Sequence, residues 1–148
     1  MADDYIPSLF ALRDYARSVA GEMFPGQSGA DDQMDAARHM LAAATAARKY
    51  GPEWAERLGQ LHEITTSPLD ALKRLLGAAP DQSYLMDIYN NRLGAHLGPK
   101  YQSQADLERA ILDLVERNAS PSYGAGTPVI MKRAHGGLAQ LKECSCGR

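Results

Sequence analysis

Residues 40–47, which read MLAAATAA, constrain the fold more than any other stretch of the chain. The stretch favours helix strongly, and no charged side chain occurs at any angle around it. A helix that is apolar on every side is stable in water only when other elements cover all of its faces. Alanine also lets neighbouring backbones approach closely. The stretch therefore predicts that a helix from about Asp31 to Tyr50 lies at the centre of the fold, wrapped by the others.

Nearly all of the chain before residue 119 shows helical spacing of its apolar residues. Between Pro7 and Phe24, for example, Leu12, Ala16 and Val19 fall on one stripe. Proline, glycine, serine and aspartate separate the successive patterns. The predicted helices cover residues 7–24, 31–50, 52–66, 68–76, 81–97 and 103–118. No strand pattern competes, so we expect an all-α fold, a single compact bundle of about five to six helices around the central alanine-rich helix.

The composition changes after Asn118. The 148 residues suffice for one domain with its own core, and we assign residues 1–118 to this helical domain. Residues 119–148 are rich in glycine and poor in core-forming side chains, which predicts an extended C-terminal arm. The arm holds four basic residues and one acidic residue, a net charge of +3, whereas the whole chain carries −2. The helical body is therefore acidic and the arm basic.

This charge distribution bears on the partners of the chain. An acidic body has no basic field to recruit nucleic acid, although the arm alone could contact it. A basic arm favours contacts with neighbouring protein subunits, either copies of this chain or other proteins, and a solubilising tail is the alternative. The arm residues that we expect to make such contacts are Lys132, Arg133, His135 and Lys142.

Targeting and cysteine signals are weak. The first residues, MADDYIPS, are acidic where a secretory signal is basic, and no apolar run approaches the roughly 18–20 residues that span a bilayer. We therefore expect neither export through a signal peptide nor a membrane span. Cys144 and Cys146 are too close for an unstrained bridge and too few for a tetrahedral metal site. No disulfide framework, metal or other cofactor is predicted.

The predicted helix over residues 81–97 carries an unusual polar stripe. At 100° per residue, Asp87, Asn90, Asn91 and Gly94 share one face. Solvated faces usually use glutamate, lysine, glutamine and arginine, whereas aspartate and asparagine disfavour helix interiors, and glycine costs about 1 kcal/mol relative to alanine. Three interpretations stay open: a solvated face, a structural hydrogen-bond network or close backbone contact, and a binding or catalytic site.

Two histidines are candidates to join this stripe. His39 follows Asp35 by four residues in the predicted central helix, and His62 lies at the edge of the apolar face of the next helix. Glu63 follows His62 but should point nearly opposite in a regular helix. A histidine at such an edge is commonly a structural residue that forms hydrogen bonds. The catalytic interpretation instead places His39, His62, Glu63, Asp87, Asn90 and Asn91 at one pocket.

The segment DAARHMLAAATAARKYGPEWAERLGQLHE and the later MDIYNNRLG together resemble a known family. It is an uncharacterised helical domain of bacterial polymorphic-toxin C-termini and tailed-phage proteins. The resemblance covers about residues 35–95. The residues that match its pattern are His39, Tyr50, Gly51, His62, Glu63, Asp87, Asn90, Asn91 and Gly94. Beside these candidate site residues, we expect structural roles for Gly51, Trp54 and Gly94.

Three functions are compatible with these features. The phage context that the resemblance implies, together with the basic arm, favours a tailed-phage virion-associated protein, present in the virion or the host cytoplasm, whose arm docks on neighbouring subunits. A second possibility is a small hydrolase or toxin-type enzyme in which histidine and carboxylates activate water, because no cysteine or serine is placed as a nucleophile. A third is an inhibitor that binds a host protein through the arm.

Overall fold

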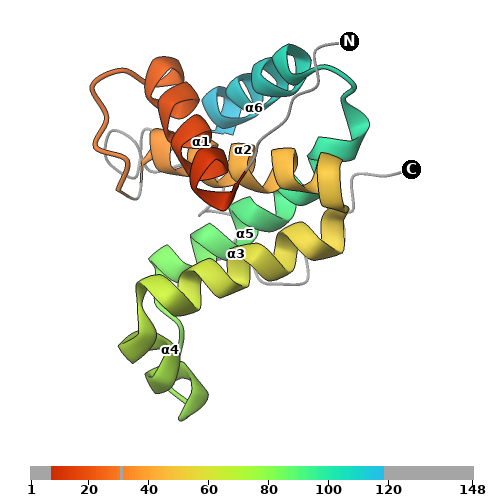
Figure 1. Ribbon diagram of the computed structural model, residues 1–148. Coiled ribbons are helices and arrows are strands. Elements are labelled where there is room, and N and C mark those ends of the chain that lie inside the picture. Colours follow the sequence, from red (N-terminus) through yellow and green to blue (C-terminus); the bar gives the residue numbers. More distant parts are fainter. Residues whose placement is uncertain (1–7, 31, 119–148) are drawn as a thin grey trace.

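The computed structural model describes residues 8–30 and 32–118, and these residues form helices joined by short loops (Figure 1). The elements are α1 (Leu9–Met23), α2 (Gln33–Tyr50), α3 (Pro52–Thr66), α4 (Pro68–Leu75), α5 (Gln82–Leu97), the 3-10 turn η1 (Gly98–Lys100) and α6 (Gln104–Asn118). No strand occurs within the described ranges, which confirms the all-α prediction. The arm predicted over residues 119–148 lies outside them. None of the described helices is long and apolar enough to cross a membrane.

The alanine-rich helix α2 lies at the centre, as its composition predicts. It contacts α1, α3, α5, η1 and α6. In Figure 1, α1 and α6 lie above α2, and α3 and α5 lie below it. Its fully buried side chains are Ala36, Ala37, Met40, Leu41 and Ala44. The small alanine side chains among them let four helices approach α2 from different sides.

Short polar side chains fix where the helices begin. The Asp32 carboxylate accepts a hydrogen bond from the Asp35 backbone N–H at the start of α2 (3.0 Å), and it also accepts the N–H groups of Ser28 and Gly29 in the preceding loop (2.9 Å each). Asp81 caps α5 in the same way through the Tyr84 N–H, at 2.8 Å. Gly51 makes the turn between α2 and α3 with a φ of 91°, a conformation that favours glycine.

Helix α5 and the η1 turn that follows it approach α2 closely at two glycines, Gly94 and Gly98, which are one helical turn apart. A β-carbon added to Gly94 would lie 2.3 Å from the Met40 carbonyl oxygen, and one added to Gly98 would lie 2.1 Å from that of Ala44. Any larger residue would force the two backbones apart. Close backbone contact, one of the interpretations left open above, therefore explains Gly94.

Helix α4 differs from the others because none of its side chains is buried. It follows α3 and extends away from α1 and α6 (Figure 1). Its leucines are half to four-fifths exposed, at 64% for Leu69, 50% for Leu72 and 82% for Leu75. The described part of the chain therefore leaves an apolar helix face at this end uncovered.

Candidate functional site

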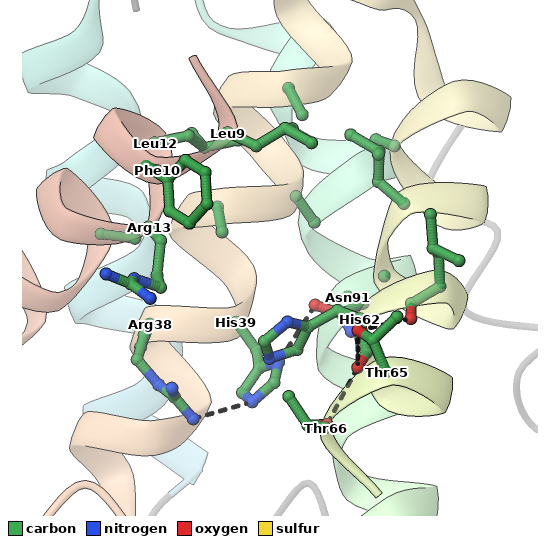
Figure 2. Close-up of a pocket in the computed structure, with 18 residues that line it drawn as sticks. Leu9, Phe10, Leu12, Arg13, Arg38, His39, His62, Thr65, Thr66 and Asn91 are labelled. Atoms are coloured by element: carbon green, nitrogen blue, oxygen red, sulfur yellow. Dashed lines mark hydrogen bonds between the residues drawn. The ribbon is translucent and has the colours of Figure 1, made fainter. Parts of the chain in front are cut away.

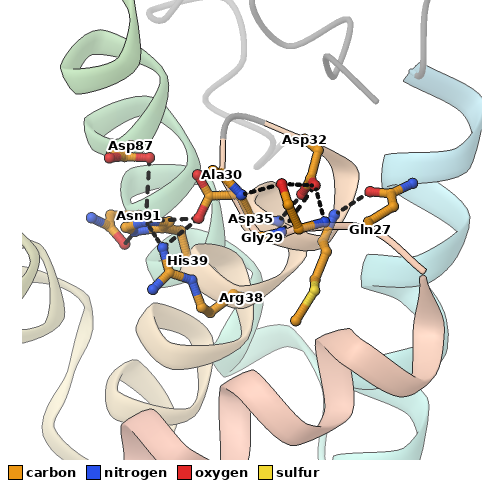
Figure 3. A network of polar contacts seen from close by, with 11 residues as sticks. Gln27, Gly29, Ala30, Asp32, Asp35, Arg38, His39, Asp87 and Asn91 are labelled. Atoms are coloured by element: carbon orange, nitrogen blue, oxygen red, sulfur yellow. Dashed lines mark hydrogen bonds and ion pairs between the residues drawn. The ribbon is translucent and has the colours of Figure 1, made fainter. Parts of the chain in front are cut away.

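His39 on α2 is the centre of a cluster of polar side chains. Its Nδ1 lies 3.2 Å from the Asn91 Oδ1, and its Nε2 lies 3.2 Å from an Asp87 carboxylate oxygen (Figure 3). The same Nε2 is 3.6 Å from a carboxylate oxygen of Asp35, one turn earlier on α2. The side chains of His39, Asp35 and Asn91 are buried. Helices α2 and α5 thus bring together a histidine, two carboxylates and an amide that are far apart in the sequence.

Arg38 contacts the nitrogen of His39 that also faces the two carboxylates. Its Nη2 lies 3.1 Å from the His39 Nε2 and also forms an ion pair with Asp35. A guanidinium only donates, so the contact with Arg38 favours the tautomer in which Nε2 accepts and Nδ1 donates its proton to Asn91, whereas the Asp87 carboxylate at 3.2 Å favours a proton on Nε2. Burial, with the Arg38 charge beside it, lowers the pKa of His39 to about 4. The imidazole is therefore neutral at neutral pH.

His62 and Glu63 bring two more titratable groups to this place from α3. The rings of His62 and His39 meet edge to face with centroids 6.3 Å apart. Partial desolvation and the nearby Arg38 lower the pKa of His62, whereas burial raises the pKa of Glu63. His62 is exposed and Glu63 is buried, yet both line one cavity. The consecutive residues thus reach the same site although they project in different directions.

An apolar cavity of about 450 Å³ lies between α1, α2 and α3. Figure 2 shows Leu9, Phe10 and Leu12 at its upper end and His39 and His62 at its lower end. The small residues Ala42, Ala43, Ala46, Ala55 and Gly59 form part of its wall. The cavity exists because these positions hold almost no side-chain volume. Its size falls within the range of small-molecule pockets, about 300–1,000 Å³.

A second, polar cavity of about 280 Å³ adjoins the first. Carboxylates outnumber guanidinium groups on its wall, which includes Glu63, Asp70, Arg74, Asp81 and Asp87. Arg38, His39 and His62 line both cavities. The two histidines therefore stand where an apolar space and an acidic space meet.

The structure brings five of the six predicted site residues to these cavities. The exception is Asn90, which is completely buried and lines neither cavity. Its amide oxygen and its amide nitrogen both lack a hydrogen-bond partner among the described residues. Trp54 is partly exposed and lies against the Tyr50 ring, with centroids 4.6 Å apart. The predicted contact residues Lys132, Arg133, His135 and Lys142 lie outside the described ranges.

Several site features were not among the predicted site residues. Arg38 and Asp35 complete the His39 cluster, and their signal was their spacing within one turn of His39. The apolar cavity had a weaker signal, the small residues along one side of α2 and α3. Asp35, His39 and Asp87 each offer a potential metal-ligand atom, and these three atoms lie within 4.8 Å of one another.

Comparison with known proteins identifies a family. No curated protein and no solved structure matches this chain. A family model described as "Domain of unknown function (DUF6973)" matches residues 4–121. This match includes every described helix and all residues of both cavities. The chain therefore belongs to this family, the DUF6973 domain family.

Proposed function

We propose that the protein is a small hydrolase that activates water where the two cavities meet. The observation that carries this proposal is the pair His62 and Glu63, whose environments shift their pKa values in opposite directions on the wall of one cavity. Titratable neighbours whose pKa values are shifted in this way are typical of acid–base pairs in enzymes.

His62 is the group best suited to be the general base. Its lowered pKa keeps it unprotonated at neutral pH, and it is exposed to both cavities, so that it can reach a water molecule. In the proposed reaction, His62 takes a proton from water as the water oxygen attacks the substrate carbonyl. His39 is less suited to this role because it is buried and its Nε2 already contacts Arg38.

Glu63 and Arg38 complete the proposed chemistry. Burial raises the pKa of Glu63, which favours its protonated form, and we assign to Glu63 the donation of a proton to the leaving group. The Arg38 guanidinium lines both cavities and can stabilise the negative charge that develops on the carbonyl oxygen. Asn91 holds the His39 ring in place beside them through its contact with Nδ1.

The two cavities indicate the class of substrate. An apolar group fits the cavity between α1, α2 and α3, and a polar group fits the acidic cavity beside α4 and α5. The bond to be hydrolysed would then lie next to His62. Esters or amides that join an apolar acyl group to a polar alcohol or amine have one apolar and one polar part, as the two cavities require.

This proposal can be tested with nitrophenyl esters of increasing acyl length. We expect kcat/KM to rise with acyl length until the apolar cavity is full, and His62→Gln or Glu63→Gln to reduce it about 100-fold or more. Gln60→Ala is the matched control, because Gln60 is exposed on the same helix and lines neither cavity. Absence of turnover by the wild type, or full activity in both variants, would refute the proposal.

Assembly is a second candidate function, and the uncovered leucines of α4 favour it. We propose that α4 pairs with α4 of a second copy in antiparallel orientation. Asp70 lies near the start of α4, and Lys73 and Arg74 lie near its end, so this pairing sets opposite charges against one another. Large exposed apolar patches typically mark interaction sites. Self-association of this kind suits the virion component expected from the resemblance.

Analytical ultracentrifugation tests this second candidate. The wild type should sediment as a dimer, and Leu72→Glu should sediment as a monomer. Phe10→Glu provides the control, because Phe10 is 72% exposed but lies on α1. A monomeric wild type, or a Leu72→Glu dimer, would exclude pairing through α4.

A further inference from the structure

We propose that Asp35, His39 and Asp87 form a binding site for a divalent cation of the Mn²⁺ or Zn²⁺ type. The cation would strengthen the water nucleophile of the proposed hydrolase, and in that respect the inference rests on the proposed function. Binding of the cation does not depend on hydrolysis and can be measured without substrate.

The spacing of the three side chains fits a common coordination sphere. The His39 Nε2 lies 3.2 Å from the Asp87 oxygen and 3.6 Å from the Asp35 oxygen, and all three atoms lie within 4.8 Å of one another. With metal–ligand bonds of about 2.1 Å, neighbouring ligands are about 3.0 Å apart in an octahedron and about 3.4 Å apart in a tetrahedron. A single ion can therefore contact all three atoms after only a small movement of one carboxylate.

The protonation state of His39 also suits a ligand. In the tautomer with the proton on Nδ1, Asn91 accepts that proton and the Nε2 lone pair is directed at the Asp35 and Asp87 oxygens. Metal-binding histidines generally use one nitrogen for the metal and donate the other N–H to an oxygen acceptor. Three electron-pair donors that converge in a buried place require a positive charge between them.

Arg38 now supplies part of that charge. Its Nη2 contacts both Asp35 and His39. The fit is incomplete, because the Arg38 Nε is buried without a hydrogen-bond partner among the described residues. The Arg38 side chain is 30% exposed and borders the polar cavity, so it has room to move outward when an ion enters. A cation would therefore compete with the Arg38 guanidinium for the same position beside Asp35 and His39.

A second group beside His39 points to a bound ligand. The Asn91 Nδ2 is buried and has no hydrogen-bond partner in the described part of the chain. Asn91 lines the apolar cavity next to His39. Its amide N–H₂ is thus available to an oxygen atom of a ligand in the apolar cavity, such as a substrate carbonyl beside the proposed cation site.

The ligand set indicates which cations to expect. One imidazole with two carboxylates suits Mn²⁺, Fe²⁺ or Zn²⁺, whereas Mg²⁺ and Ca²⁺ prefer oxygen ligands alone. The excess of carboxylates around the polar cavity attracts cations to it. Water would fill the remaining coordination positions on the side of this cavity, and its pKa would fall toward neutrality.

Isothermal titration calorimetry of the chelator-treated full chain with MnCl₂ or ZnCl₂ tests the site. We expect one site, with affinity lowered at least 10-fold in Asp87→Asn and in Asp35→Asn. Asp70→Asn is the matched control, because Asp70 lines the same polar cavity outside the cluster. Arg38→Gln should bind the cation more tightly, since it removes the competing charge.

A measurement on the wild type protects the test against variants that fail to fold. In a protein with ¹⁵N-labelled histidine, Zn²⁺ should shift the Nε2 resonance of His39 strongly and leave that of His96 almost unchanged. No binding of either ion, equal affinity in the wild type and the folded Asp87→Asn variant, or an unshifted His39 resonance would overturn the proposal. A failed hydrolysis assay with intact Zn²⁺ binding would overturn only the proposed function.

Discussion

The contact between α2 and α5 has two ends of opposite character. At the glycine end, Gly94 and Gly98 bring the α5 backbone directly against the α2 carbonyl groups of Met40 and Ala44. At the polar end, about one to three turns earlier on α5, side chains fill the contact, and His39 meets Asp87 and Asn91 beside two cavities. One helix pair thus combines an end without space for a ligand and an end with space for one.

This difference between the two ends indicates how the side chains at the polar end are positioned. Backbone contact at the glycine end fixes the register of α5 on α2. The two helices can approach so closely only where glycine of one helix faces the backbone of the other. The same register places Asp87 and Asn91 opposite His39. Substitutions at the glycine end should therefore affect the stability of the whole bundle, and substitutions at the polar end should affect chemistry with smaller changes in stability.

The largest effect is expected for Gly98→Ala. The added β-carbon would lie 2.1 Å from the Ala44 carbonyl oxygen, and backbone atoms cannot move aside as a flexible side chain can. Steric overlap of this kind should lower the free energy of unfolding by about 3 kcal/mol or more. Urea denaturation followed by circular dichroism measures this loss.

Gly21→Ala is the matched control for that experiment. Gly21 lies within α1, and its nearest neighbour to an added β-carbon is the Met34 methyl group at 3.5 Å, an ordinary contact. Alanine there should raise the free energy of unfolding by about 0.5–1 kcal/mol, because it favours helix. Equal effects at Gly98 and Gly21 would show that the close backbone approach at the glycine end does not exclude a side chain.

The next largest effect is expected for Asn90→Leu. Asn90 is completely buried, and its amide has no hydrogen-bond partner among the described residues, so its burial opposes folding. A leucine, which has the same number of side-chain heavy atoms branched at the same carbon, should raise the free energy of unfolding by about 1 kcal/mol. Thermal denaturation measures the change, and a destabilised variant would show that the Asn90 amide has a partner which stabilises the fold.

Much of the fold could be predicted because its signals are local. The alanine-rich stretch predicts the central place of α2, and the bounds of α3 follow from Gly51–Pro52 and Ser67–Pro68. The 3-10 turn after α5 was missed, since Gly98–Pro99 indicates only that the helix stops. The close packing of Gly98 on Ala44 depends on the distance between two helices, which local patterns do not contain.

The candidate site could be predicted in part. Helical spacing alone groups Asp87 with Asn91 and Asp35 with His39, and the structure joins these two pairs. Spacing cannot show that Asn90 turns inward while Asn91 faces His39, because both lie on one broad sector of the helix. The apolar cavity was not foreseen, since it arises from small residues on separate helices that leave a shared space.

Gly59→Ala sharpens the comparison at the polar end. An added β-carbon would lie 2.8 Å from the Asn91 Nδ2, so the Asn91 side chain must shift. We expect the free energy of unfolding to change by less than about 1 kcal/mol, because the helix-favouring alanine offsets the displacement. The hydrogen bond between Asn91 and His39 should weaken, which a faster-exchanging Nδ1 proton of His39 would show by NMR. An unchanged Nδ1 signal would mean that Asn91 does not hold the ring.

The smallest effect on stability is expected for Glu63→Gln, and it should depend on pH. Burial raises the pKa of Glu63 in the folded chain above its value in the unfolded chain, so the folded state holds this proton more tightly. The wild type should therefore lose stability as the pH rises from the unfolded pKa of about 4.3 through the raised folded value. Glutamine does not titrate, so the variant should gain stability relative to the wild type over this window, and the gain should then level off.

Urea denaturation across this pH window measures the gain in stability of Glu63→Gln, with Glu53→Gln on the exposed start of α3 as the control. A gain that is constant with pH would show that Glu63 is ionised normally, and it would remove Glu63 as the general acid at the polar end.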